Sequence, residues 1–138
     1  MGSLKTSREG SRRGDPKPPR PMEVRVIACL REVHSSLGPG LLETVYEEAL
    51  AHEFHLQGLR FQRQKEAKLS YKGTHIGWHR VDFVVEDEVV VELKSVERLH
   101  GIHEAQVTAS LRSLGKRAGV LVNMNAVPLE KGIRRILL

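Results

Sequence analysis

The fold of this chain is decided by two adjacent runs, Arg80-Val81-Asp82-Phe83-Val84-Val85 and Val89-Val90-Val91-Glu92-Leu93-Lys94. Both runs are rich in valine, which is typical of strands that are covered on both faces. The residues between them, Glu86-Asp87, predict a turn, so the two runs form an antiparallel hairpin. A charge inside such an apolar segment is costly unless it is paired or bound. The charges within these runs therefore mark a special site.

Three of these charged side chains, Asp82, Glu92 and Lys94, are expected to meet. Strand side chains alternate with a period of two, so Glu92 and Lys94 share a face, and Asp82 on the neighbouring strand reaches it. Carboxylate oxygens are the ligands that Mg²⁺ or Mn²⁺ prefers, and a lysine can neutralise charge that develops on a phosphate. A structural salt-bridge cluster is the alternative reading.

The remaining elements follow from the spacing of apolar residues and from turn signals. Helical spacing predicts two helices before the first strand, separated by Gly38-Pro39-Gly40. The pair Lys72-Gly73 predicts a turn between two strands, and a later helix crosses over to a strand parallel to a core strand. The predicted order is α-α-β-β-β-α-β, over residues 26–37, 41–57, 61–71, 76–85, 89–94, 103–114 and 120–123, with a short last element at 129–138.

The pattern Asp82 then Glu92-x-Lys94 resembles the metal-binding signature of the PD-(D/E)xK nuclease superfamily. Upstream, the run 40–46 reads G-x-x-E-x-x-Y, and the chain resembles the GxxExxY family of small prokaryotic proteins, which is placed in that superfamily. Further matches occur in the same order from about Val26 to the C-terminus, at Arg80-x-Asp82, His103-Glu104-Ala105-Gln106, Leu121-Val122-Asn123 and Gly132-Ile133-Arg134-Arg135-Ile136. One departure is Ala109-Ser110, where such proteins typically have Asn-Tyr.

The resemblance implies an α/β (α+β) fold with a restriction-endonuclease-like αβββαβ core. Its mixed central sheet is flanked by helices, and an extra helix precedes it at the N-terminus. At 138 residues the chain is long enough for one domain with its own core. We expect residues 22–138 to form this nuclease-like domain.

The resemblance also implies a metal site for Mg²⁺ or Mn²⁺. Asp82 and Glu92 would be direct ligands, with the carbonyl of Leu93 as a third. Glu43, from the second helix, would hold a metal-bound water or a second ion. The alternative for Glu43 is an ordinary acid in the first turn of a helix, favoured by the helix dipole.

Two further residues complete the expected catalytic set. Lys94 would orient the attacking water, help to deprotonate it, or stabilise the charge on the phosphate, and the sequence does not choose among these roles. Gln106 would form a hydrogen bond to the site from the crossing helix, or would be a solvent-exposed amide.

Three residues are candidates for substrate contacts. Arg80 lies two residues before Asp82 and would pair with the acids or grip the scissile phosphate, and the alternative is that it completes a structural ion pair. Tyr46 is expected to be a packed aromatic with its hydroxyl near Glu43, and not a nucleophile, because no base is placed to activate it. His103 falls in the family pattern. The other histidines suggest zinc, but one cysteine and no closed set of four ligands argue against it.

The charge of the chain is unevenly distributed. Its net charge is +5, and residues 1–21 hold six basic and two acidic side chains, which leaves +1 for residues 22–138. Glycine, proline and charge dominate residues 1–21, which predicts a disordered basic tail. No run has the apolar length of a membrane span or a signal peptide, and the single Cys29 is typical of a reducing cytoplasm.

Three functional classes follow from these patterns. The first is a metal-dependent nuclease that hydrolyses phosphodiester bonds, with DNA as the expected substrate. The second is a nuclease-fold module without turnover that binds nucleic acid or protein, and the third is a subunit-interaction protein whose acids form a structural ion cluster. A homodimer is expected because so small a domain covers only a short length of duplex.

Overall fold

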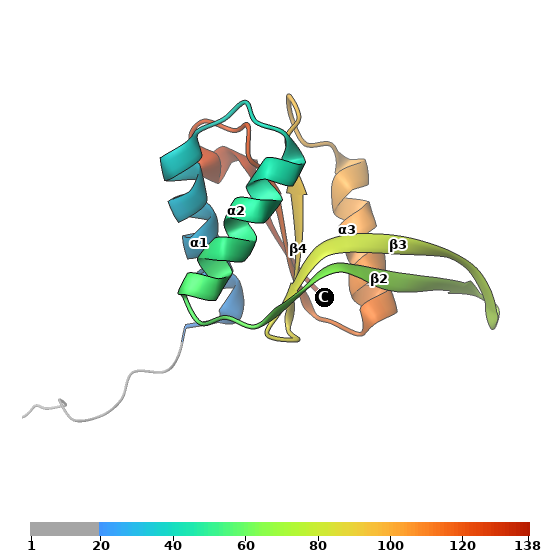
Figure 1. Ribbon diagram of the computed structural model, residues 1–138. Helices are drawn as coiled ribbons and strands as arrows, with labels where there is room; N and C mark the ends of the chain where they lie inside the picture. The colour runs from blue at the N-terminus through green and yellow to red at the C-terminus, as the bar shows by residue number, and fades with distance from the viewer. Residues whose placement is uncertain (1–19) are drawn as a thin grey trace, which may run out of the picture.

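The computed structural model describes residues 20–138 (Figure 1). The predicted disordered tail therefore lies, apart from Arg20 and Pro21, outside the described residues. The elements in chain order are α1 (Met22–Leu37), α2 (Glu43–Leu56), β2 (Phe61–Tyr71), β3 (Thr74–Val85), β4 (Val89–Lys94), α3 (Gly101–Leu114), β5 (Ala118–Asn123), the short 3₁₀ helix η1 (Leu129–Gly132) and β6 (Ile133–Leu137).

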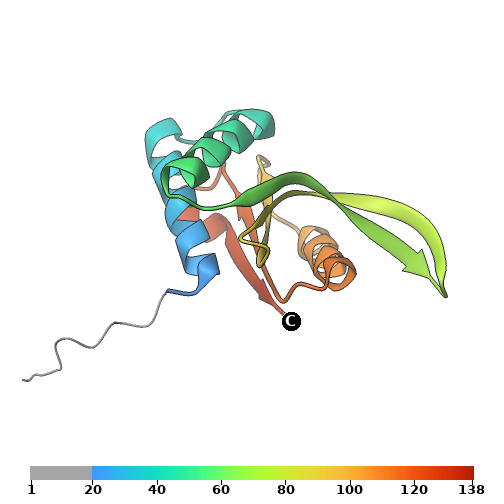
Figure 2. The same ribbon diagram turned by 60° about the horizontal axis from the view of Figure 1, so that its bottom comes forward.

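The five strands form one mixed sheet in the order β2-β3-β4-β5-β6. The β4–β5 pair is parallel, as the sequence predicts for the strand after the crossing helix, and the other pairs are antiparallel. The helices α1 and α2 lie on one side of the sheet and α3 lies on the other (Figures 1 and 2). This arrangement confirms the predicted α+β, restriction-endonuclease-like fold with its additional N-terminal helix.

Two apolar cores hold these layers together. The larger core lies between the sheet and the helices α1 and α2, and it includes the fully buried Tyr46, Phe54 and Phe83. The smaller core joins the sheet to α3 through residues such as Val90 and Leu111. Both faces of β4 are therefore covered, which explains its nearly continuous run of valine.

Several element boundaries differ from the predicted ones: α1 begins four residues earlier than expected, and β3 and β5 each begin two residues earlier. Helix α2 begins at Glu43, two residues later than expected, and α3 begins at Gly101, two residues earlier. At the start of α3 the His100 backbone N–H donates to His103 Nδ1 at 3.0 Å, which satisfies a donor that a helix N-terminus leaves free. The last predicted element, 129–138, divides into η1 and the edge strand β6.

The hairpin of β2 and β3 extends beyond the rest of the sheet (Figures 1 and 2). Strand β3 pairs with β4 only from Phe83 to Val85, but it pairs with β2 along almost its whole length. The hairpin closes at Lys72-Gly73, where both residues have positive φ, 46° and 83°, as a two-residue hairpin turn requires. We call residues 65–80 of this hairpin the arm.

Among the described residues, no helix has the length and apolar character needed to cross a membrane.

Candidate active site

The site lies where β3 separates from β4. On the N-terminal side of Phe83 the backbones of β3 and β4 are no longer paired. Two carboxylate side chains accept hydrogen bonds from backbone N–H groups there. The Asp82 backbone N–H donates to Glu92 Oε1 at 2.9 Å, and the Leu93 N–H donates to Asp82 Oδ2 at 2.8 Å. Each acid thus binds the strand that carries the other acid. The predicted convergence of Asp82 and Glu92 is present in the structure.

Beside this point one residue of β2 has a left-handed backbone, and the register of β2 with β3 is the same on both sides of it. Gln64 has a positive φ of 51°, which is uncommon for a residue other than glycine. On β3, Val81 packs in the core of α3 whereas Phe83 packs in the core of α1 and α2, although the two residues are two apart. Strand β3 therefore changes its facing at Asp82, and simple alternation fails there.

The side chain of Gln64 connects Asp82 to Glu47 of α2. The Gln64 side-chain amide donates to Asp82 Oδ1 at 3.2 Å and to Glu47 Oε1 at 2.8 Å. Glu47 lies one helical turn after Glu43 on α2, so the two acids share a face. The negative charges of Glu47 and Glu43 both contribute to raising the pKa of Asp82, after the larger effect of burial.

Burial dominates the electrostatics of the site. Glu92 is 5% exposed, and burial, followed by repulsion from Asp82, raises its pKa to about 8. His79 Nε2 lies 3.3 Å from Glu92 Oε2, and burial, followed by the positive charge of Lys94, lowers the pKa of His79. A carboxyl that keeps its proton and an imidazole that stays neutral can share one hydrogen bond, with the Glu92 oxygen as donor.

Lys94 lies at the end of β4 and is partly buried. Its charge lowers the pKa of Glu92 and of His79, so the ammonium acts on both groups. It follows Glu92 by two residues on the same strand face, as the sequence predicts.

The loop after β4 places Glu43 beside the same strand. Glu43 Oε2 accepts a hydrogen bond from the Ser95 backbone N–H at 3.2 Å. The buried Asn123, at the end of β5, holds this loop in place. Its side chain accepts a hydrogen bond from the Val96 N–H at 3.1 Å and donates one to the Val96 carbonyl at 2.9 Å. A shallow pocket at Glu43 is lined by these two segments and by the loop after β5, through residues Gly40, Leu41, Leu42, Glu43, Thr44, Ser95 and Asn125.

The donor chemistry of the site fits a hard divalent cation. Each oxygen of Asp82 and Glu92 has one hydrogen-bond partner and so retains a free lone pair. Burial raises the pKa of both carboxyl groups, and the charge of Asp82 raises that of Glu92 further, so a nearby positive charge stabilises the pair in its ionised form. Within residues 20–138, no three His, Cys, Asp or Glu side chains are close enough to form a metal-binding cluster. The observed geometry therefore provides the central acid pair and not the full predicted ligand set.

Three predicted site residues have other partners in the structure, and a fourth is exposed to solvent. Arg80 lies 3.4 Å from Glu66 and does not pair with the acids at Asp82, because β3 changes its facing between them. The Tyr46 hydroxyl donates to the Gly38 carbonyl at 2.6 Å, and Tyr46 is fully buried, so it holds the loop before α2 and offers no exposed atom to a substrate. His103 accepts the hydrogen bond at the start of α3, and Gln106 is exposed on α3.

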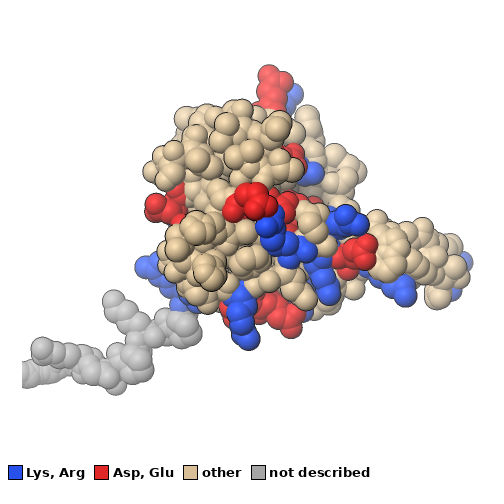
Figure 3. Space-filling view, in the orientation of Figure 1, with Lys and Arg blue, Asp and Glu red and all other residues tan. Residues whose placement is uncertain are grey.

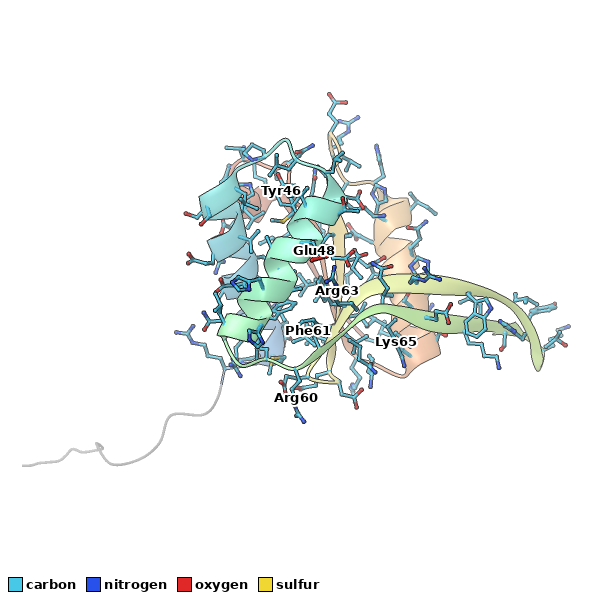
Figure 4. All side chains as sticks on the ribbon, in the orientation of Figure 1. Tyr46, Glu48, Arg60, Phe61, Arg63 and Lys65 are labelled. Atoms are coloured by element: carbon cyan, nitrogen blue, oxygen red, sulfur yellow. The ribbon has the colours of Figure 1, made fainter. Side chains whose placement is uncertain are left out.

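Sequence reasoning gave no site role to Glu47, Gln64 and His79. Glu47 could have been found from its spacing of four residues after Glu43, but the positive φ of Gln64 leaves no signal in the sequence. Glu47 is also bound by Arg63 at 2.7 Å, and Arg63 contacts the neighbouring Glu48 at 2.6 Å. Figure 4 shows Glu48 of α2 and Arg63 of β2 next to each other, and in Figure 3 acidic and basic side chains are in contact on this face.

This constellation of two acids and a lysine on neighbouring strands, within a mixed sheet flanked by helices, defines a nuclease-like protein. The family model described as the PD-(D/E)XK nuclease superfamily matches residues 20–136. The chain therefore belongs to the PD-(D/E)XK nuclease superfamily, whose nucleases generally use divalent metals. A search of curated proteins and a search of solved structures each gave no significant match.

Proposed function

We propose that this protein is a metal-dependent nuclease that hydrolyses phosphodiester bonds of DNA. The observation that carries the proposal is the reciprocal hydrogen bonding of Asp82 and Glu92 at the point where β3 and β4 separate, with Lys94 two residues further along β4. Burying two acids together is unfavourable, and it raises the pKa of both. Metal-dependent catalysis gives a reason to keep them there.

The proposed ligands of a Mg²⁺ or Mn²⁺ ion are Asp82, Glu92 and the Leu93 carbonyl, with Glu43 holding a water or a second ion. A divalent cation bound there supplies positive charge to the phosphate and lowers the pKa of water. Glu43 is well placed for its role because it reaches the backbone N–H of Ser95, directly after Lys94.

The reaction is the attack of water on phosphorus, with cleavage of the bond to the leaving ester oxygen. As an ammonium, Lys94 stabilises the charge that develops on the phosphate oxygens; its alternative role, taking the proton of the water, requires the neutral amine. Gln64 holds Asp82 and Glu47 in one orientation, which restricts the rotation of Asp82. We keep the predicted contacts of Arg80 and His103 with the substrate, and of Gln106 with the site, as part of this proposal. A separate substitution of each residue would test its contact.

The assignment to the GxxExxY family is also part of the proposal. In the motif, Glu43 reaches the loop after β4, and Tyr46 binds the backbone of the glycine-rich segment before α2. These contacts give the spacing of the motif a structural reason. A cytoplasmic location and a homodimer stay predictions.

The alternative is a nuclease-fold module that binds nucleic acid or protein without turnover. One observation favours it: the acids of the site already satisfy backbone donors of β3 and β4, which is a structural role. In that case neutral isosteres of the acids would leave every activity of the protein intact.

A cleavage assay separates the two functions. Linear, nicked and branched DNA are incubated with Mg²⁺ or Mn²⁺ and with wild type, Asp82→Asn, Glu92→Gln, or the exposed control Glu88→Gln. The nuclease proposal predicts cleavage by wild type and the control, and a loss of at least about 100-fold in both site variants. Cleavage that persists in Asp82→Asn and Glu92→Gln contradicts it, as does a folded wild type that cleaves none of these DNA forms.

A further inference from the structure

We propose that the arm, residues 65–80, lies in the major groove of double-stranded DNA and holds the duplex beside the Asp82–Glu92 site. This inference rests on the proposed function, because it assigns the form of DNA that the site would act on. It adds a DNA-binding element to a domain whose size alone suggests a short footprint.

The shape of the arm fits a groove. It is a two-stranded antiparallel ribbon, and the major groove of B-DNA admits such a ribbon. From Arg80 to the turn at Gly73 the arm extends over about seven residues, which span roughly 23 Å at about 3.3 Å per residue. That is about two thirds of one turn of the duplex, which is about 34 Å.

One face of the arm is covered and the other is open. Toward α3, Ala67 is fully buried, and the Ser113 hydroxyl donates to the Lys68 carbonyl. The register places Lys68 opposite Trp78, and Trp78 is 56% exposed. On its other face the arm therefore exposes side chains to solvent, and no helix or strand of residues 20–138 covers them.

The charge of the arm is opposite to that of the rest of the domain. Residues 65–80 contain four basic side chains and one acidic side chain, a net charge of +3. Since residues 22–138 sum to +1, the remainder of that range carries −2. Lys and Arg side chains are visible at the base and along the lower edge of the arm in Figure 3. A polyanion is attracted to such an arm, whereas the arms of two copies repel each other.

Exposed aromatic and apolar groups accompany the basic ones. Tyr71 is 60% exposed and Ile76 is 65% exposed, and the ring of His75 packs against the ring of Trp78 at 4.5 Å between centroids. Lys72 Nζ lies 5.3 Å from the ring centroid of Tyr71. Apolar and aromatic side chains next to lysines contact thymine methyl groups, bases and phosphates in protein–DNA complexes.

The test uses Trp78 as a reporter, because it is the only tryptophan of the full chain. Full-length protein is titrated with a duplex of about two helical turns, and separately with one of its strands, in EDTA so that nothing is cleaved. The proposal predicts that the duplex reduces acrylamide quenching of Trp78 several-fold, and that the single strand protects it less.

The variant for this test is Lys68→Gln with Lys72→Gln, and the matched control is Arg117→Gln with Lys131→Gln, two exposed basic residues outside the arm. The arm variant should bind duplex about 10-fold more weakly near 0.1 M salt, and the slope of log affinity against log salt should fall by about two. The control should change neither. The proposal is wrong if the arm variant binds duplex as tightly as wild type, or if duplex leaves Trp78 open to acrylamide. It is also wrong if the single strand protects Trp78 more than the duplex does, or if raising the protein concentration without DNA protects Trp78.

The experiments distinguish an error in the arm proposal from an error in the nuclease proposal. If the protein cleaves DNA but Trp78 stays accessible in the complex, the arm proposal is wrong and the nuclease stands. If duplex protects Trp78 in wild type and in Asp82→Asn, but wild type cleaves no DNA, the arm proposal stands and the nuclease is wrong. With both correct, the arm variant raises KM and leaves kcat unchanged.

Discussion

Replacing Glu92 by glutamine should stabilise the metal-free protein. In the folded state burial and the charge of Asp82 raise the pKa of Glu92 to about 8, against an ordinary value of 4.5. Between these two values the folded protein holds a proton that the unfolded chain releases, so the free energy of unfolding falls as pH rises. At pH 7 the difference covers about 2.5 pH units, which at about 1.4 kcal/mol per unit corresponds to a penalty of about 3 kcal/mol.

Glutamine removes this penalty and keeps the geometry. Its side-chain oxygen still accepts from the Asp82 N–H, and its amide still donates to His79 Nε2. The expected gain in the free energy of unfolding is therefore up to about 3 kcal/mol at pH 7, and it should vanish near pH 4.

Urea unfolding in EDTA at a series of pH values from 4 to 8 measures this gain. The exposed Glu88→Gln serves as the control, because it changes the same charge without removing a buried group. Two results would show that burial of Glu92 does not destabilise the protein at pH 7. One is a Glu92→Gln variant that is no more stable than wild type at pH 7, and the other is a gain in stability that does not shrink as pH falls toward 4.

Three further substitutions test the framework of the site through urea unfolding. Tyr46→Phe should cost about 1–2 kcal/mol, because it leaves the Gly38 carbonyl without its donor; an unchanged stability would show that the loop does not need this hydroxyl. Asn123→Ala should cost about 2 kcal/mol and loosen the loop after β4, because the Val96 N–H loses its acceptor and the Val96 carbonyl keeps only the Asn125 side-chain amide at 3.3 Å; a cost equal to that of an exposed Asn→Ala change contradicts this. Gly132→Ala should cost at least about 2 kcal/mol, since a Cβ there would lie 2.7 Å from a backbone oxygen, and a neutral result would mean that the backbone moves freely.

The fold was largely predictable because its signals are local. The valine runs of β3 and β4, the turn residues between elements and the helical spacing of α1 each follow from periodicity and turn chemistry. The parallel pairing of β4 and β5 followed from the crossing helix between them. Boundaries were less certain because the residues that begin α3 form their own cap.

The site was predictable only as far as regular strands extend. Asp82, Glu92 and Lys94 were selected as candidates because charges inside apolar strands are rare and costly, and the structure places Asp82 and Glu92 together. Arg80 was misplaced because alternation fails where β3 changes its facing, and Gln64 was missed because its left-handed backbone depends on the tertiary contacts with Glu47 and Asp82. Side chains placed by an irregular backbone have no periodic signal in a single sequence.

The most direct test of the central claim is a calorimetric titration with Mn²⁺. Wild type, Asp82→Asn, Glu92→Gln and the control Glu88→Gln are each titrated at pH 7.5, after circular dichroism has shown that all four are folded. We expect wild type and the control to bind Mn²⁺ and to release protons, because Glu92 must ionise when the metal binds. Both site variants should lose this binding. Absence of Mn²⁺ binding by folded wild type, or equal binding by all four proteins, would contradict the claim that the paired acids form a metal-dependent active site.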